Sequence, residues 1–233
     1  MILFDIDNTL VDYSKSESET IRFIMDKYGL KVDQYGKYWK DVSKKYFTKY
    51  LRQEMSFQEQ GAQRIRELFE QGGRVLSLEA SENIFFEYKE KLERNWVLFD
   101  DVIPCLEKLN TVNKGIASNG QAEQQNRKLQ RTGIDSYFSV KKYASEMHCA
   151  KPDLQFFESL KKSCGKGDFV YVGDDLQTDI YPCMEVGIKA IWVNREGKKV
   201  PEGVTAVRGL GELNIEKEEV SPYAGIMGRI RQK

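Results

Sequence analysis

The sequence of 233 residues has no excess of charge of either sign, because 36 lysines and arginines balance 36 aspartates and glutamates. A chain without net charge has no overall field that attracts nucleic acid, an acidic membrane or another polyanion. We therefore expect no nucleic acid and no membrane among its partners. Small substrates of any charge remain open.

The sequence also lacks the residue patterns that build zinc sites. Its four cysteines, at positions 105, 149, 164 and 183, show no C-x-x-C spacing, and it has one histidine, His148. Structural zinc sites need several cysteines and histidines at close spacing. The cysteines are instead predicted to be buried, reduced thiols.

No apolar run is long enough to span a bilayer, and the apolar start, Ile2–Phe4, is far too short for a signal peptide. From these absences we expect a soluble, cytoplasmic protein. We expect it to act as a monomer or a small homo-oligomer.

Short apolar runs that each end in polar residues are the first positive feature. They are Ile2–Phe4 before Asp5, 115–117 before Ser118, and 169–172 before Gly173. Helical patterns follow at 102–109, 123–131, 154–163 and 177–186, with one more possible strand at 204–207. This alternation predicts an α/β fold with a doubly wound, Rossmann-like parallel sheet, and the polar residues should meet at the carboxyl ends of its strands. The charged tail from Glu216 onward predicts nothing specific.

A large insertion interrupts the alternation directly after the first strand. Residues 14–96 hold about four helical patterns, so we predict an α/β core of residues 1–13 and 97–233 and an all-helical cap of residues 14–96. One of these helices should start at the capping-box spacing of Ser56 and Glu59 and end at Gly72-Gly73. The cap aromatics either pack its interior or stack on a nucleobase or sugar; they are Tyr35, Tyr38, Trp39, Tyr46, Phe47 and Tyr50.

Asp5 and Asp7 stand two residues apart directly after the first strand. Residues at this spacing point to the same side of a strand, so the two carboxylates can stay close together. Close carboxylates repel, and one holds its proton unless a cation lies between them. Asp5 can then act as a nucleophile and Asp7 as an acid. The alternative is that these residues cap a turn.

Two further strand ends carry groups that can bind phosphate. The hydroxyl of Ser118, in Ser118-Asn119-Gly120, and that of Thr9 can meet phosphate oxygens where a helix begins. Lys151 can offset negative charge on Asp5 and on a phosphoryl group. The alternatives are an ordinary helix cap and a solvated lysine. Pro152 is expected near the first position of the next helix.

Three acids follow the run 169–172, namely Asp174, Asp175 and Asp179, and so many carboxylates imply a cation. Mg²⁺ needs few carboxylates besides water and substrate phosphate, and its candidate ligands are Asp5, Asp174 and the backbone carbonyl of Asp7. Asp179 is expected to hold Lys151 or a metal-bound water. Asp175 either assists there or caps the helix that follows.

Taken together, D-x-D-x-T, a strand ending in Ser, a Lys-Pro pair and G-D-x-x-x-x-D, in this order, resemble the haloacid dehalogenase superfamily of hydrolases. The resemblance covers nearly the whole chain, and the insertion looks like the helical cap of its phosphatase-rich subclass. Asn8 stands where many members have glycine, a known variation.

The resemblance implies a Mg²⁺-dependent phosphatase that acts on a small-molecule phosphate ester. In that case Asp5 is the nucleophile that forms an aspartyl-phosphate, and Asp7 is the general acid and then the base. The phosphate would be bound by Thr9, Ser118, Asn119 and Lys151, and the metal by Asp5, Asp174 and the Asp7 carbonyl. A nucleotide, a sugar phosphate or a phosphoglycolate-like ester would be the substrate.

Three alternatives compete with this interpretation. A 2-haloacid dehalogenase shares the fold and the nucleophile, but needs no metal and typically lacks an aspartate at the place of Asp7. A signalling receiver carries its acid pair before its phospho-acceptor, which is not the order here. A non-catalytic binding module of the same fold would be expected to have a broken site, whereas every element is present in this sequence.

Overall fold

The chain folds into an α/β unit and a helical unit. The computed structural model describes residues 1–164 and 169–214, so the charged tail from Glu216 lies outside the described residues. The first unit contains residues 1–12 and the residues from Leu98 onward, and the second is Tyr13–Val97. The helices of the described residues include none that is both long and apolar enough to cross a membrane.

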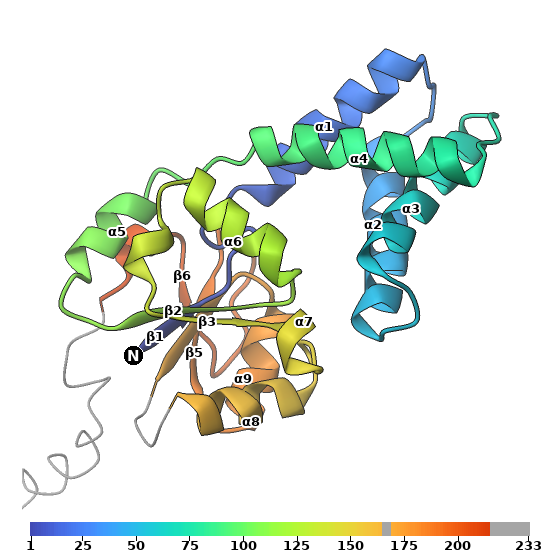
Figure 1. Cartoon of the computed structure of the whole chain (residues 1–233). Coiled ribbons are helices and arrows are strands. Elements are labelled where there is room, and N and C mark those ends of the chain that lie inside the picture. Colours follow the sequence, from blue (N-terminus) through green and yellow to red (C-terminus); the bar gives the residue numbers. More distant parts are fainter. Residues whose placement is uncertain (165–168, 215–233) are drawn as a thin grey trace, which may run out of the picture. The chain divides into compact units, whose positions relative to one another are not determined.

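The α/β unit is built on a parallel sheet of six strands within the described residues (Figure 1). The strands are β1 (Ile2–Phe4), β2 (Lys114–Ser118), β3 (Val140–Tyr143), β4 (Val170–Gly173), β5 (Lys189–Val193) and β6 (Thr205–Val207). Their order is β3-β2-β1-β4-β5-β6, and every neighbouring pair is parallel. From β1 the chain builds outward through β2 and β3, and then returns to add β4, β5 and β6 on the other side. The predicted doubly wound fold is confirmed, and its switch point lies between β1 and β4.

Helices cover both faces of this sheet. They are α5 (Val102–Lys108), α6 (Ala122–Arg131), α7 (Ala144–Met147), α8 (Leu154–Ser163) and α9 (Tyr181–Glu185), with short turns η1 (Asp135–Tyr137), η2 (Leu176–Ile180) and η3 (Leu210–Glu212). Helices α5 and α6 lie on one face, and α8 and α9 on the other (Figure 1). Because both faces are covered, β1, β2 and β4 are buried along their whole length.

The helical unit consists of α1 (Tyr13–Tyr28), α2 (Tyr35–Leu51), α3 (Phe57–Gln71) and α4 (Leu78–Arg94). Helix α3 begins with the predicted capping box, in which the Glu59 amide donates to Ser56 Oγ at 3.1 Å and the Ser56 amide donates to Glu59 Oε2 at 2.7 Å. The helix ends at Gly72 as expected.

The interior of the helical unit is apolar and aromatic. Trp39 is buried in it, with its ring 5.2 Å from that of Tyr88, and Tyr35 and Tyr38 pack against the same cluster. These three residues therefore pack the interior of the helical unit, which is one of the two roles expected for its aromatic residues. Tyr46, Phe47 and Tyr50 are only partly buried.

Two local predictions are wrong. Cys105 and Cys183 are buried, but Cys149 and Cys164 are only partly buried, because Cys149 lies in the loop after α7 and Cys164 at the end of α8. Pro152 is not in the first turn of α8: Asp153 caps that helix by accepting from the Gln155 amide at 2.8 Å, so Pro152 precedes the cap.

Candidate active site

The loop after β1 places Asp5 at the switch point of the sheet. The Asp5 amide donates to the carbonyl of Val172 on β4 at 2.9 Å, and the residue is 7% exposed. The chain then turns, with the amides of Leu10 and Val11 both donating to the carbonyl of Ile6. Asn8 supports this turn in the left-handed region, at φ 61°, which asparagine tolerates better than most residues. A tight turn thus holds Asp5, Asp7 and Thr9 together.

Lys151 lies between two carboxylates in the buried interior of the site. Its Nζ is 2.9 Å from Asp5 Oδ1 and 2.6 Å from Asp179 Oδ1, and it also donates to the hydroxyl of Tyr171 at 2.9 Å. Burial alone would lower the pKa of this lysine, but the charges of Asp179 and Asp5 raise it above the ordinary value. Lys151 therefore stays positively charged beside Asp5.

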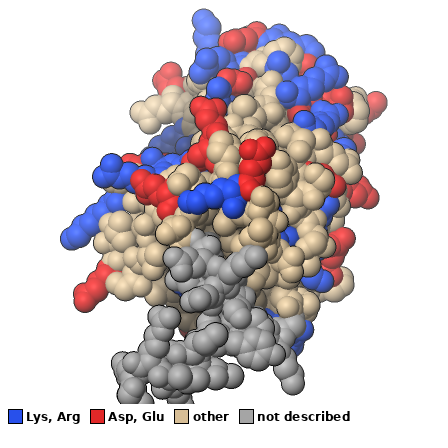
Figure 2. All heavy atoms as spheres, turned by 90° about the vertical axis from the view of Figure 1, so that its left-hand side faces the viewer, with Lys and Arg blue, Asp and Glu red and all other residues tan. Residues whose placement is uncertain are grey.

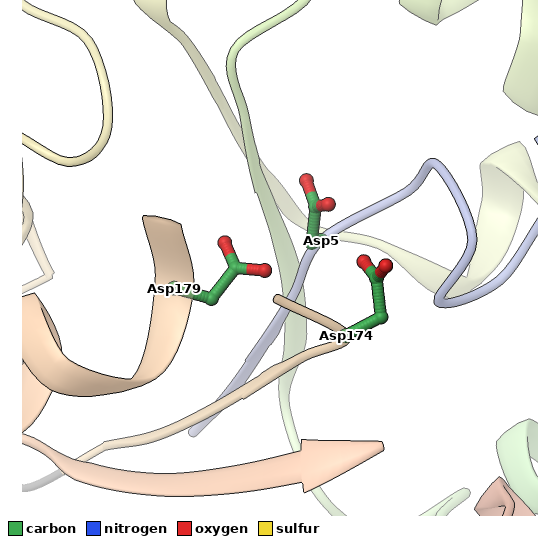
Figure 3. A group of neighbouring side chains, drawn as sticks. All are labelled: Asp5, Asp174 and Asp179. Carbon is green, nitrogen blue, oxygen red and sulfur yellow. The ribbon is translucent and has the colours of Figure 1, made fainter. Parts of the chain in front are cut away.

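Asp5, Asp174 and Asp179 form a carboxylate cluster whose oxygens lie within 4.8 Å of one another. Figure 3 shows the three side chains converging from the end of β1, the end of β4 and the turn η2. Burial, together with the charges of the other two acids, raises the pKa of Asp174 to about 8. Burial also raises the pKa of Asp5 to about 6, against the opposing charge of Lys151. Such crowding is costly without a compensating cation.

The side chain of Asp7 contacts two residues of α6 that the sequence did not indicate. Lys128 forms an ion pair with Asp7 Oδ1, and Gln125 Nε2 donates to Asp7 Oδ2 at 3.0 Å. Residues three apart on a helix share a face, but the sequence does not show that the face carrying Gln125 and Lys128 is the buried one.

Thr9 and Ser118, the two hydroxyl residues predicted to bind phosphate, lie near the acidic residues at the carboxyl ends of the strands. Thr9 is fully buried and donates to Asp174 Oδ1 at 3.2 Å, and Ser118 is 3% exposed and accepts from Gln125 Nε2 at 3.2 Å. The structure thus brings both close to the acids, and Gln125 links Ser118 to Asp7.

Asn119 and Asp175 are engaged with the backbone. The side chain of Asn119 donates from Nδ2 to the backbone carbonyl of Lys151, and its Oδ1 accepts from the backbone amide of Lys151, both at 2.7 Å. Asn119 therefore holds the backbone of that lysine in place. Asp175 Oδ1 accepts from the amides of Gln177 and Thr178 at 2.9 and 2.7 Å, which makes it the cap of η2.

The donor set of the carboxylate cluster suits a hard divalent cation. Asp179 is occupied, because its Oδ1 accepts from Lys151 and Tyr171 and its Oδ2 from the Asp175 amide. Asp5 and Asp174 are then the carboxylates most open to a metal. Mg²⁺ typically takes one or two carboxylates plus water and substrate phosphate, so these residues fit it.

Comparisons with known proteins identify the family of this chain. Residues 2–193 match the family model described as haloacid dehalogenase-like hydrolase. The chain is 28% identical over 212 residues to mouse N-acylneuraminate-9-phosphatase, covering 84% of this chain and 83% of that protein. It is 31% identical over 103 residues to the pyrimidine 5'-nucleotidase YjjG of Escherichia coli, covering 43% and 46%.

Solved structures show the same fold at lower identity. The HAD-hydrolase YfnB from Bacillus subtilis, bound to magnesium, superposes with a TM-score of 0.77 at 20% identity, covering 91% of this chain and 95% of that one. L-2-haloacid dehalogenase from Xanthobacter autotrophicus gives 0.69 at 16% identity, covering 91% and 96%. Since the family model spans most of the chain, this protein belongs to the haloacid dehalogenase-like hydrolases.

Proposed function

We propose that the protein is a Mg²⁺-dependent phosphatase that hydrolyses a small-molecule phosphomonoester through an aspartyl-phosphate on Asp5. The observation that carries this proposal is the meeting of the Asp5, Asp174 and Asp179 carboxylates within 4.8 Å, with Lys151 2.9 Å from Asp5. Phosphoryl transfer depends on charge compensation at such a site.

In the first step, an oxygen of Asp5 attacks phosphorus and the bond from phosphorus to the ester oxygen breaks. Asp7 gives a proton to the departing oxygen, so the alcohol leaves neutral. Lys151, Ser118 and Thr9 bind the phosphoryl oxygens during this transfer. Asn119 contributes by holding the backbone of Lys151.

In the second step, Asp7 takes a proton from a water molecule, which attacks the phosphorus of the aspartyl-phosphate. The bond to Asp5 breaks, inorganic phosphate leaves and the carboxylate is restored. Mg²⁺, held by Asp5, Asp174 and the Asp7 carbonyl, would supply positive charge for the carboxylates and the phosphoryl oxygens. Asp179 keeps Lys151 in place throughout.

A haloacid dehalogenase activity is less well supported by these residues. That reaction needs neither a proton-donating second acid nor a metal. This chain has Asp7, which can serve as the second acid, and a crowded cluster of carboxylates, which suits a metal. A reaction at phosphorus uses both features.

The substrate is proposed to be a nucleotide, a sugar phosphate or a similar small ester. Two relatives support these classes, since one is named for an acylneuraminate 9-phosphate and the other for pyrimidine 5'-nucleotides. We propose that residues 13–97 act as the cap that selects among them. The partly buried Tyr46, Phe47 and Tyr50 are candidates for contact with the substrate.

The charged side chains on the face in Figure 2 are mixed in sign. Basic and acidic side chains are interspersed over the described part of the face in Figure 2, so that face shows no broad patch of one sign. A cytoplasmic location and a monomer or small homo-oligomer remain predictions.

The test is release of inorganic phosphate from a panel of nucleoside monophosphates, sugar phosphates and phosphoglycolate, with Mg²⁺ and with a chelator. The proposal expects release from at least one ester with Mg²⁺ and its loss with the chelator. Absence of release from every ester, combined with halide release from 2-haloacids, would replace it with the dehalogenase activity.

A further inference from the structure

One face of α6 is directed at the side chain of Asp7. Gln125 and Lys128 are three residues apart, so they lie side by side on the helix surface. Lys128 pairs with Oδ1 of Asp7 and Gln125 donates to Oδ2, so each carboxylate oxygen has its own donor. Two donors on two different oxygens fix the plane of the carboxylate as well as its position. Each oxygen keeps a further lone pair, which can carry the proton that Asp7 transfers.

The burial of these donors shows that the arrangement is costly to build. Lys128 and Gln125 are each 1% exposed, whereas lysine is almost never fully buried unless it is paired. Asp7 is more open, with 31% of its side chain exposed. The buried partners thus hold a carboxylate that is itself partly exposed to solvent.

Gly120 makes room for Gln125. A Cβ atom at position 120 would lie 2.1 Å from Gln125 Nε2, far inside contact distance. The same Nε2 also donates to Ser118 Oγ at 3.2 Å. One amide group therefore sets the distance between the hydroxyl proposed to bind phosphate and the carboxylate proposed to transfer the proton.

We propose that Lys128 and Gln125 are positioning residues that hold Asp7 in line with the leaving oxygen of the substrate. This inference rests on the proposed phosphatase function. The proton moves from Asp7 to the ester oxygen as its bond to phosphorus breaks, so misplacing the carboxylate slows this first step, which determines kcat/KM, only where the leaving group needs that proton. An alcohol needs the proton, whereas p-nitrophenolate leaves readily without it.

The experiment measures kcat/KM for two esters, the sugar or nucleoside phosphate that the wild type hydrolyses fastest and p-nitrophenyl phosphate. Lys128→Met should lower the value for the alkyl ester by about 10- to 100-fold, and that for p-nitrophenyl phosphate by less than about threefold. Gln125→Glu replaces a donor by an acceptor of equal size and should show the same selectivity. Lys162→Met, which removes a lysine from an exposed position of α8, is the matched control and should change neither value.

A second arm tests whether Lys128 acts through Asp7. In an Asp7→Asn background, Lys128→Met should cost less than about threefold for the alkyl ester, because the group that it positions no longer transfers a proton. Equal losses for both esters in folded Lys128→Met and Gln125→Glu, or a full additional loss in the Asp7→Asn background, would overturn the inference while leaving the phosphatase proposal intact. A wild type that hydrolyses neither ester would instead overturn the phosphatase proposal, and this inference with it.

Discussion

At the scale of single residues, Asp5 carries the chemistry proposed for the site. Asp5→Asn keeps the size of the side chain but removes the attacking oxygen anion, so phosphate release should fall by at least about a thousandfold. The fold should survive, because the change removes a buried charge from a crowded acidic cluster. Phosphate release and a thermal unfolding curve check both parts. Activity within tenfold of the wild type, in a folded variant, would exclude the aspartyl-phosphate.

Asp174 gives a prediction about pH. Burial raises its pKa from 3.8 to about 8, so between these values the metal-free folded chain binds a proton that the unfolded chain has released. The contribution of Asp174 to the free energy of unfolding is therefore complete below about pH 4 and is lost as the pH rises to about 8. Urea unfolding of the chelated protein should show this fall, and Asp174→Asn should make it shallower. Parallel curves for the two proteins would contradict the assignment.

The residues at strand ends could be predicted from the sequence because a parallel sheet brings them together whatever the details of packing. That logic located Asp5, Ser118 and Asp174. It could not locate Lys128, whose contact with Asp7 spans 121 positions in the sequence and depends on which face of α6 is buried. A lysine on a helix is usually solvated, so no local pattern distinguished this one.

At the scale of elements, the loop after β5 contacts the turn that follows β1 through Arg195. Its guanidinium makes a bidentate pair with Asp101, both contacts at 2.9 Å, lies 3.7 Å above the ring of Phe99, and donates to the Thr9 carbonyl at 3.0 Å. Lysine cannot reproduce this fork.

Arg195→Lys should therefore lower the free energy of unfolding by about 2 kcal/mol, the usual range for hydrogen bonds of charged groups. It should also reduce phosphate release, because Thr9 loses its anchor. Urea unfolding and the ester assay measure the two effects. Arg208→Lys, at an exposed position directly after β6, is the control and should change the free energy by no more than a few tenths of a kcal/mol. Equal effects of the two changes would show that the anchor has no role.

The two strands that the sequence did not predict differ in physical character. Strand β3 reads Val-Lys-Lys-Tyr and lies at the edge of the sheet, where it needs no continuous apolar run. Strand β5 has a clear apolar run at 190–193, but no acid of the site follows it, so the pattern of strands ending in acids did not indicate it. Sequence patterns thus predicted the strands that carry the site better than the strands that complete the sheet.

At the scale of the whole molecule, the insertion leaves and re-enters the α/β unit at adjacent points. Val11 forms an antiparallel bridge with Leu98, and the Phe99 amide donates to the Leu10 carbonyl at 3.2 Å. The apolar cluster of the helical unit is built from residues within Tyr13–Val97. The two ends of the insertion are therefore already joined within the α/β unit, a geometry that tolerates the removal of an inserted domain.

Replacement of Tyr13–Val97 by a short glycine- and serine-rich linker should leave a folded α/β unit. We expect far-ultraviolet circular dichroism and a cooperative urea transition typical of an α/β protein. Hydrolysis of p-nitrophenyl phosphate should persist at a reduced rate, because Asp5, Asp7, Lys151 and Asp174 all remain, whereas preference among nucleotides and sugar phosphates should disappear. A linker variant with an intact preference would show that specificity comes from the α/β unit, and one that does not fold would show that this unit depends on the helical insertion.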